Sequence, residues 1–420
     1  MMSGSKHARV LAGLAGLVTA GVLLPEPILA QERGGLSNLI RDLYGGDGIQ
    51  PIGGPVGGTP EHHPFRPSFV LLDDPDLFDL NDEIGRNIAF APFNAAAAAI
   101  VFDIERGVPV RADDSLGPFL VREASTIGQN RMSFGVSYAR IDYQNYEGDD
   151  LDDQEFVFSH TDCCPPGGTP SPGQPTFEQD QIRVNLDLEL TQDIFAFFST
   201  YGITNNWDVG LVVPIVSVDA SVRSVGTIIP SPNNPDPTIH QFDRSDPDPD
   251  LSGVDSNSDS ATGIGDIAFR SKYNFLRDQP VLPDAAVLGQ VTLPTGDDDD
   301  LLGSGDTAVL GLLIGTKDFG RFSVHGNVGY EMFFDDLEDA LRYGAGTDVL
   351  VFDGVTAVGE VLGRYEPNGD GTSDVVDGLV GLKWNPTGDV VLSSFVLTPI
   401  NRDTGLRADV VWGLGIELGF

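Results

Sequence analysis

The chain has 420 residues, of which 24 are Lys or Arg and 63 are Asp or Glu, so its formal net charge is -39. This acid excess argues against a nucleic-acid partner, because a phosphate backbone is bound by clustered Lys and Arg side chains. The length fits either several soluble domains or one large barrel, so length alone does not separate these classes.

Residues 1–30 have the pattern of a secretory signal peptide. Lys6 and Arg9 precede the apolar run "VLAGLAGLVTAGVLL", and Ala30 is a small residue at a cleavage position before the polar "QERGG". The apolar run is too short for a spanning helix, and no other stretch reaches the roughly 18 consecutive apolar residues that such a helix needs. We therefore expect an exported protein that is either soluble or inserted in a membrane as a barrel.

Residues 31–130 form a predicted N-terminal extension. The stretch is mostly irregular and rich in Gly and Pro, as in "GGDGIQPIGGPVGGTP", with one predicted helix around "DLNDEIGRNIAFAPFNAAAAAI". About 100 residues without an obvious core of their own should pack against something larger. We expect this extension to plug the barrel lumen or its periplasmic mouth.

Residues 131–420 alternate with a period of two, which predicts an all-β fold. The clearest example is "IRVNLDLEL", and the same alternation recurs in "WDVGLVVPIV", "GDIAFRSKYNF", "RFSVHGNVGYEM" and the final "RADVVWGLGIELGF". We predict about twelve strands, an even number as single-chain bacterial barrels require.

The connections between these strands sort by length. The odd-numbered ones are mostly long and acidic, such as "PTGDDDDLLGSG" and the Asp/Pro-rich insertion Ser231 to Ser260, whereas the even-numbered ones are short, such as "KDFG" and "FDG". Short periplasmic turns and long outer loops are typical of a transmembrane antiparallel β-barrel. In such a barrel the last strand must pair with the first, because an unpaired sheet edge is too costly in hydrocarbon.

Four motifs in order resemble one family. They are "YGITNNWDVGLVVPIV", "GIGDIAFRSKYNF", "LPTGDDDDLLGSGD" and "GRFSVHGNVGYE", and "SLGPFLVREASTIGQNRMSFGVSYARIDY" is similar to that family's lead into its first strand. The family is that of transporter-like outer-membrane proteins of the MetA pathway of phenol degradation. The resemblance covers the chain from about Ser115 onward and implies the uptake of small hydrophobic molecules. The sequence departs from the family in its Asp/Pro insertion and in adjacent cysteines.

Charged residues on the polar faces of the strands are candidates to line the lumen. Such side chains either pair with one another and stiffen the wall or line a permeation path, and the alternation does not separate these roles. The candidates are Arg183, Asp187, Glu189, Asp266, Arg270, Lys272, Arg321, His325, Glu331, Glu360, Arg364, Asp377, Lys383, Asp409 and Glu417.

Aromatic residues on the apolar faces are candidates for interfacial girdles. A terminal aromatic at the periplasmic interface also serves as the assembly signal of such barrels, as implied by their resemblance to other members of the class. The candidates are Trp207, Tyr273, Tyr330, Trp384, Trp412 and Phe420.

No metal site is assigned from the acidic loops. Their carboxylates do not match the twelve-residue calcium pattern, so solvated loops are favoured over divalent-ion binding. The weak candidates are Asp246, Asp248, Asp250, Asp297 and Asp298. Cys163 and Cys164 leave open a strained bond between neighbours, and His62 and His63 have no third ligand at usable spacing.

These patterns predict a passive channel in the outer membrane of a Gram-negative cell. The sequence lacks the "GxSxG", "HExxH" and P-loop patterns, so we expect neither catalysis nor a cofactor. The expected partners are the lipid bilayer and lipopolysaccharide, the barrel assembly machinery, and small hydrophobic or aromatic solutes. Two alternatives remain: a surface structural or adhesion barrel whose acidic loops bind calcium, and an exported soluble β-protein.

Overall fold

The structure is a computed structural model of the whole chain. It describes residues 36, 52–53, 65–67, 100–104, 108–111, 116–146, 148–160, 179–232, 234, 240–242, 251–334, 337–367, 374–402 and 404–418. The predicted signal peptide, most of the predicted extension, the Cys163 and Cys164 pair, the two histidines and Phe420 lie outside the described residues. The predicted helix also lies outside them, except for Ile100, which belongs to a strand.

The described part of the chain is all β, as predicted. The strands of the barrel wall are β5 (Arg131–Tyr146), β8 (Gln181–Thr204), β9 (Trp207–Ile229), β11 (Ser252–Ile264), β12 (Ile267–Leu276), β13 (Asp284–Leu293), β14 (Ala308–Asp318), β15 (Phe322–Phe333), β16 (Ala340–Phe352), β17 (Val355–Tyr365), β18 (Asp374–Trp384), β19 (Val390–Pro399) and β20 (Leu406–Leu418). Shorter strands are β1 (Ile52–Gly53), β2 (Phe65–Pro67), β3 (Ile100–Asp103), β4 (Val108–Arg111), β6 (Asp149–Asp150), β7 (Gln154–His160) and β10 (His240–Gln241). None of the helical turns among the described residues is long and apolar enough to cross a membrane.

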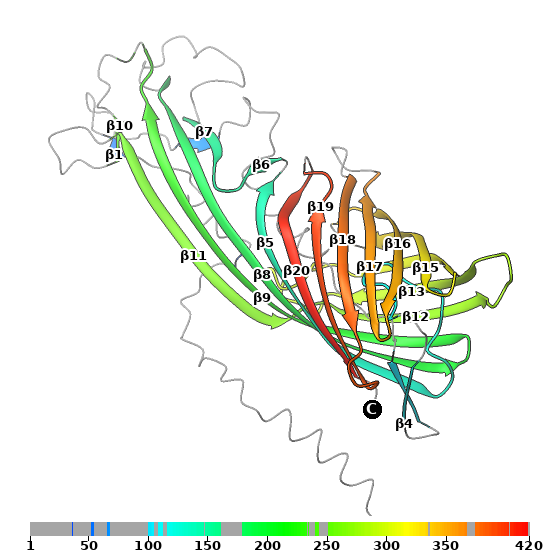
Figure 1. The fold of residues 1–420 in the computed structure, drawn as a ribbon. Coiled ribbons are helices and arrows are strands. Elements are labelled where there is room, and N and C mark those ends of the chain that lie inside the picture. Colours follow the sequence, from blue (N-terminus) through cyan, green and yellow to red (C-terminus); the bar gives the residue numbers. More distant parts are fainter. Residues whose placement is uncertain are drawn as a thin grey trace, which may run out of the picture. The chain divides into compact units, whose positions relative to one another are not determined.

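The sheet closes on itself as an antiparallel barrel. Successive wall strands pair with each other, except that β11 and β12 both pair with β9, and β20 returns to pair with β5, for example Leu414 with Tyr138. The two strands lie side by side in Figure 1. Closure leaves no open edge at this seam, which is the requirement for a sheet in hydrocarbon. The predicted twelve-strand barrel is therefore confirmed, with β11 and β12 counted as one interrupted strand.

The interruption between β11 and β12 is a β-bulge. On β9 the pairing passes from Ile215 opposite Ile264 to Val212 opposite Ala268, so three residues of one strand face two of the other. Pro214 lies opposite this bulge, and its carbonyl accepts a hydrogen bond from the Gly265 amide at 2.9 Å. A proline has no N–H for a central ladder, so a bulge is where a central strand tolerates it.

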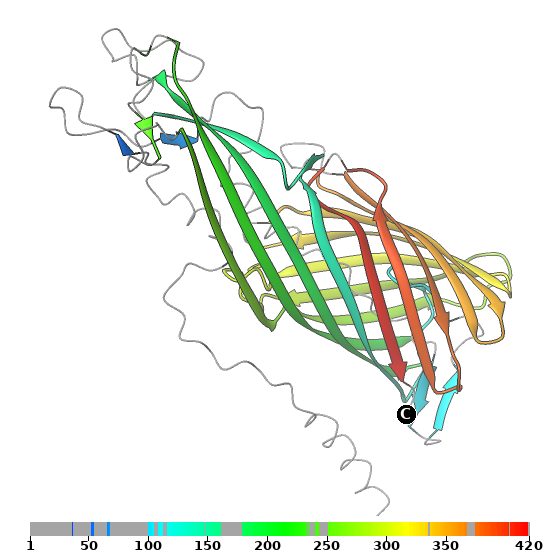
Figure 2. The same ribbon diagram turned by 60° about the vertical axis from the view of Figure 1, so that its left-hand side comes forward.

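Strand β11 corrects one prediction from the sequence. Residues 252–260 were expected in the third connection between strands, but they pair with β9 from Ser252 opposite Thr227 onward. Together β8, β9 and β11 extend beyond the other wall strands (Figure 2). The Ser- and Asp-rich sequence of β11 hides this strand, because few apolar side chains mark its alternation.

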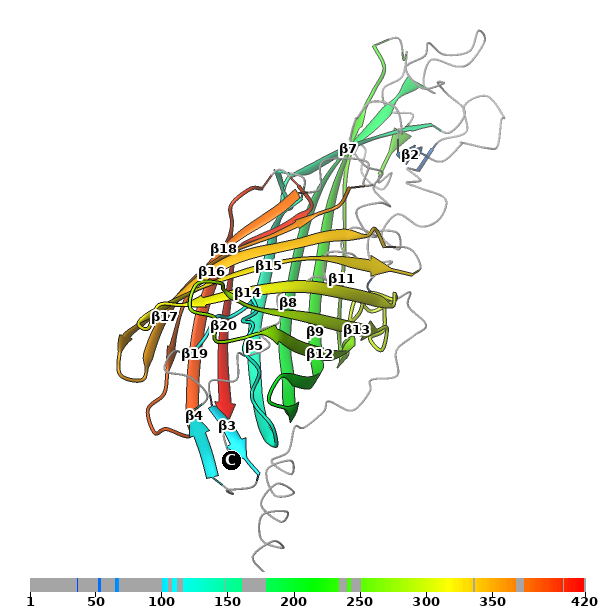
Figure 3. The same cartoon turned by 90° about the vertical axis from the view of Figure 1, so that its right-hand side faces the viewer.

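The bounds of the strands agree with the predicted sorting of connections. The links after β8, β14, β16 and β18 are short, and β13 follows β12 at the same end of the barrel. The longest links follow β5 and β9, at the opposite end. Below, these are called the short-connection end and the long-connection end. Figure 3 shows strands β12 to β16 side by side along one wall.

The two faces of the wall differ in chemistry. Outward residues are large and apolar, such as Phe195 and Phe197 on β8 and Phe269 on β12, and they remain exposed. Hydrocarbon can cover such side chains, whereas a soluble protein rarely exposes a wide apolar band. Inward residues are buried and include many charged and polar groups.

Candidate functional site: the barrel lumen

Residues Leu116–Gln129 cross the interior of the barrel. Most of this segment is buried or half-buried, and its backbone bonds to inward side chains from β9, β12, β14, β15, β17 and β18. The backbone N–H and C=O groups of an extended segment that is not paired in a sheet need other hydrogen-bond partners, and here side chains of the barrel wall supply them. We call residues 116–129 the lumen segment.

Glu360 on β17 holds the middle of the lumen segment. Its carboxylate accepts hydrogen bonds from three successive amides: that of Phe119, that of Leu120 at 2.9 Å and that of Val121 at 3.0 Å. Glu360 is only 4% exposed, so the amide donors replace the water that a buried carboxylate would otherwise need. Charge-assisted bonds of this kind are about twice as strong as neutral ones.

Lys383 on β18 holds the start of the lumen segment. Its ammonium donates to the carbonyl oxygens of Leu116 at 3.1 Å and Pro118 at 2.6 Å. The same ammonium lies 4.9 Å from the ring centroid of Phe119, within the range of a cation–π contact. Lys383 is fully buried and lies 4.0 Å from Glu417 on β20.

Phe119 fills a gap that a glycine leaves in the wall. Its ring packs 5.3 Å from that of Phe395, and a Cβ at Gly381 would lie only 2.5 Å from its Cε2 atom. The missing side chain at Gly381 therefore lets the ring approach the backbone of β18. Phe119 is 1% exposed, so the lumen segment contributes a fully buried side chain to the barrel interior.

The second half of the lumen segment bonds to the opposite wall. Asn327 on β15 accepts from the Arg122 amide at 2.5 Å and donates to the Arg122 carbonyl at 2.8 Å. Thr316 accepts from the Ala124 amide at 2.9 Å, and Asn274 donates to the Ala124 carbonyl at 2.8 Å. Because Thr316 and Asn274 lie near the short-connection ends of β14 and β12, the segment lies toward that end of the lumen.

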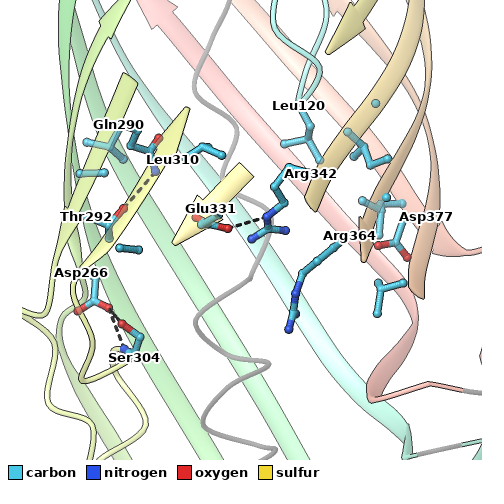
Figure 4. Close-up of a pocket in the computed structure, with 18 of the residues that line it drawn as sticks. Leu120, Asp266, Gln290, Thr292, Ser304, Leu310, Glu331, Arg342, Arg364 and Asp377 are labelled. Atoms are coloured by element: carbon cyan, nitrogen blue, oxygen red, sulfur yellow. Dashed lines mark hydrogen bonds and ion pairs between the residues drawn. The ribbon is translucent and has the colours of Figure 1, made fainter. Parts of the chain in front are cut away.

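A cavity of about 340 Å³ lies on the other side of the lumen segment, toward the long-connection end. Leu120 and Arg122 of the segment contribute to its lining, together with inward residues from most wall strands. Apolar side chains such as Leu288 and Leu312 alternate around the lining with charged ones. In Figure 4, Arg342 and Arg364 reach into the space between the walls.

Each of the three acidic side chains in the cavity lining forms a hydrogen bond or an ion pair with another residue. Asp266 accepts from the amides of Gly296 at 2.9 Å and Ser304 at 2.8 Å and from the Ser304 hydroxyl at 2.7 Å. Glu331 accepts from Arg342 Nε at 2.6 Å, and Asp377 pairs with Arg407. Figure 4 marks the Asp266–Ser304 and Glu331–Arg342 contacts with dashed lines.

Most of the predicted lumen residues do face inward. Eight of them contact the lumen segment or line the cavity, and six of these eight are Asp266, Arg270, Lys272, Glu331, Glu360 and Lys383. Arg364 and Asp377 also line the cavity, Glu417 is buried beside Lys383, and His325 is buried with Asp348 at 2.5 Å.

Five predicted lumen residues lie elsewhere. Arg183, Asp187 and Glu189 lie on the same face of β8 as Phe195, which is the outward face, while Ile182, Val184, Leu186, Leu188 and Leu190 are buried inside. In this outer part of β8 the apolar face packs inward on other residues instead of meeting lipid. Arg321 is exposed in a short connection. Register shifts in β20 before Val411 place Arg407 in the cavity lining, and Asp409 instead pairs with Arg402 at 2.8 Å.

The five predicted aromatic residues that the structure describes are exposed on the outer face, but they lie at three heights. Trp207, Tyr273 and Trp384 lie near the short-connection end, and Trp207 is directly opposite Tyr273. Tyr330 lies near the long-connection end and Trp412 near the middle of β20. Only the first three residues therefore share one height on the barrel wall.

The weak metal candidates receive no support from the described residues. Asp246, Asp248 and Asp250 lie outside them. Asp297 and Asp298 lie in the connection between β13 and β14, where their carbonyls accept from Leu302 and Leu301. In the described part of the chain no group of three or more His, Cys, Asp or Glu side chains is placed to hold a metal ion.

Several lumen residues were not predicted from the sequence. Asn327, Thr316 and Asp208 bind the lumen segment, and Gln290 and Arg342 line the cavity. Asn327 and Asp208 do fall on the polar side of strands whose alternation was recognised. Arg342 was missed because "RYGAGTD" on β16 has too many small residues to show a clear period of two.

The closed barrel, its apolar outer face and its polar interior define an outer-membrane β-barrel. Residues 167–351 match the family model described as "Putative MetA-pathway of phenol degradation". This match confirms the predicted family resemblance over that range. None of the curated proteins compared with the chain matches it.

Solved structures that are similar to this chain include two channels and a transporter. The COG4313 outer membrane channel from Pseudomonas putida F1 is 12% identical, with 74% of this chain and 99% of that chain covered and a TM-score of 0.41. The Ralstonia pickettii toluene transporter TbuX is 11% identical, with 79% and 100% covered and a TM-score of 0.37. The CymD monoaromatic hydrocarbon channel is 8% identical, with 69% and 88% covered and a TM-score of 0.34.

Proposed function

We propose that this protein is a passive outer-membrane channel for small hydrophobic or aromatic molecules. The observation that carries the proposal is a cavity of about 340 Å³ inside a closed barrel whose outer face is apolar. Its lining combines apolar side chains with charged and polar ones, and binding sites for small molecules use polar groups of this kind to fix the orientation of the ligand. The family match over residues 167–351 supports the same function.

In this proposal the lumen segment is the constriction. It lies between the cavity and the short-connection end, and Glu360 and Lys383 hold it in place. A solute entering at the long-connection end would reach the cavity first and pass the segment on its way to the periplasm. The wider predicted organisation belongs to the same proposal: residues 1–30 direct export and are cleaved, residues 31–130 form the plug and residues 131–420 form the barrel. The barrel assembly machinery and lipopolysaccharide are its proposed partners.

Current block by phenols tests this function. The purified protein in a planar bilayer is expected to give stepwise ion currents, and phenols with longer alkyl chains should interrupt them for longer because they bury more apolar surface in the cavity. Glycerol, which has no apolar body, is the control solute. Blockades of the same duration for every solute, or no current at all, would contradict the proposed function.

A further inference from the structure

Arg270 differs from the other cations of the cavity. It lies on β12 and lines the cavity, and its Nε donates to Gln290 Oε1 at 2.7 Å. No carboxylate among the described residues pairs with it, and Nη1 and Nη2 make no hydrogen bond to any of them. Arg342 and Arg407, in contrast, are paired with Glu331 and Asp377.

Among the described residues, no cavity acid pairs with Arg270. The three acids of the lining bind other groups. The charged side chain that acts electrostatically on Arg270 is Arg122, which has the same sign. The guanidinium groups of Arg122 and Arg270 both face the cavity; that of Arg122 interacts with Glu360, whereas none of the described carboxylates acts on that of Arg270. Arg270 is half-buried, and a partly desolvated cation is stabilised by an opposite charge beside it. A bound anion would supply that opposite charge.

The cavity wall near Arg270 includes three leucines. Arg270 lies directly opposite Gln290, Gln290 lies opposite Leu310, and one step along the same face Leu288 lies opposite Leu312. All of these residues line the cavity. The free nitrogens of Arg270 therefore lie next to a patch that suits an aromatic or alkyl body. A guanidinium can bind a carboxylate through two parallel hydrogen bonds, which fixes the orientation of the anion.

We propose that the cavity binds small monocarboxylates, with the carboxylate on Arg270 and the apolar body against Leu288, Leu310 and Leu312. Gln290 orients the guanidinium by accepting from Nε. This inference rests on the proposed function for the way a solute reaches the cavity, but binding itself needs no permeation. It narrows the hydrophobic cargo to molecules with an acidic head group.

Calorimetric titration of the full chain in detergent tests the site. The probe is benzoate, and benzamide is its neutral counterpart of nearly the same shape. Benzoate is expected to bind more tightly than benzamide, and Arg270→Gln should weaken benzoate binding by roughly 10- to 100-fold while leaving benzamide binding unchanged, as expected for the loss of hydrogen bonds to a charged group. Arg183→Gln is the matched control, because Arg183 lies on the outward face of β8, and it should bind benzoate as the unmodified protein does.

A second variant shows whether a loss of binding comes from the site or from misfolding. Gln290→Leu keeps the charge of Arg270 but removes the acceptor that orients it, so we expect a several-fold loss of benzoate affinity at unchanged heat-modifiable migration on gels. Equal affinity for benzoate and benzamide, or equal benzoate affinity in Arg270→Gln and Arg183→Gln, would overturn the proposal. If the protein binds benzoate but passes no current, the proposed channel function is refuted and the proposed carboxylate site at Arg270 is supported. If the protein passes current but binds benzoate no more tightly than benzamide, only the proposed carboxylate site is refuted.

Discussion

Glu360→Gln should release the lumen segment from the barrel wall. The carboxylate now accepts from the amides of Phe119, Leu120 and Val121. A glutamine keeps one oxygen acceptor but turns an NH2 group toward these amides, so at least one hydrogen bond is lost and the others become neutral. With hydrogen bonds to charged groups contributing about 1.5–3 kcal/mol each, the docked segment should lose about 2–4 kcal/mol. This corresponds to roughly a 30- to 1000-fold shift toward the undocked segment.

Hydrogen exchange measures this shift directly. A peptide that covers Phe119 to Val121 should exchange its amides faster in Glu360→Gln by a similar factor, because exchange follows the population of the open state. Glu155→Gln is the matched control, since Glu155 forms a half-exposed pair with Arg183 at 3.2 Å and such pairs contribute little. Unchanged protection in Glu360→Gln would refute the idea that this carboxylate holds the segment.

Three further predictions concern stability. Lys383→Met removes the donor to two carbonyls and leaves the buried Glu417 without its lysine neighbour, so the protein should unfold at a lower temperature and its free energy of unfolding should fall by about 3–5 kcal/mol. Adding Glu417→Gln should recover part of this free energy. A double variant no more stable than Lys383→Met would argue against a stabilising pair between Lys383 and Glu417. Gly381→Ala should displace the Phe119 ring and speed exchange in the lumen segment, which the same peptide reports, whereas unchanged exchange would show that the ring has room to move. The pKa of Asp300, in the connection between β13 and β14, is raised by burial and by Asp297, Asp259 and Asp299, so protonation favours the folded connection and its stability should rise as the pH falls toward the usual aspartate pKa of about 3.9. Proteolysis of this connection against pH should show the trend, and Asp300→Asn should remove it; a trend of the opposite sign would contradict the assignment.

The barrel could be predicted from the sequence because its two main constraints are local. Alternation in strands such as β12 and β15 follows from a wall with lipid on one side, and the sorted connections follow from two different ends. Closure of β20 on β5 then follows from the cost of an open edge in hydrocarbon. These arguments need no knowledge of distant contacts.

The interior was predicted less well, because alternation defines two faces but not which of them is inside. On β8 the polar residue Arg183 lies outside and the apolar Ile182 inside, since this part of the strand packs on protein instead of lipid. Asp409 was misplaced because the register shifts of β20 leave no sign in the residue pattern. Glu360 accepts hydrogen bonds from amides about 240 positions earlier in the chain, and these contacts exist only in the closed barrel. The sequence could therefore identify Glu360 as an inward charge but not the amides that it binds.

Single-channel conductance tests the central claim most directly. The protein without residues 1–30 and a variant that also lacks residues 31–128 are compared in planar bilayers under the same salt conditions. A channel constricted by the lumen segment predicts stepwise currents in both proteins and a larger conductance in the variant. Equal conductance would contradict the constriction, and the absence of current from both proteins would contradict the channel itself.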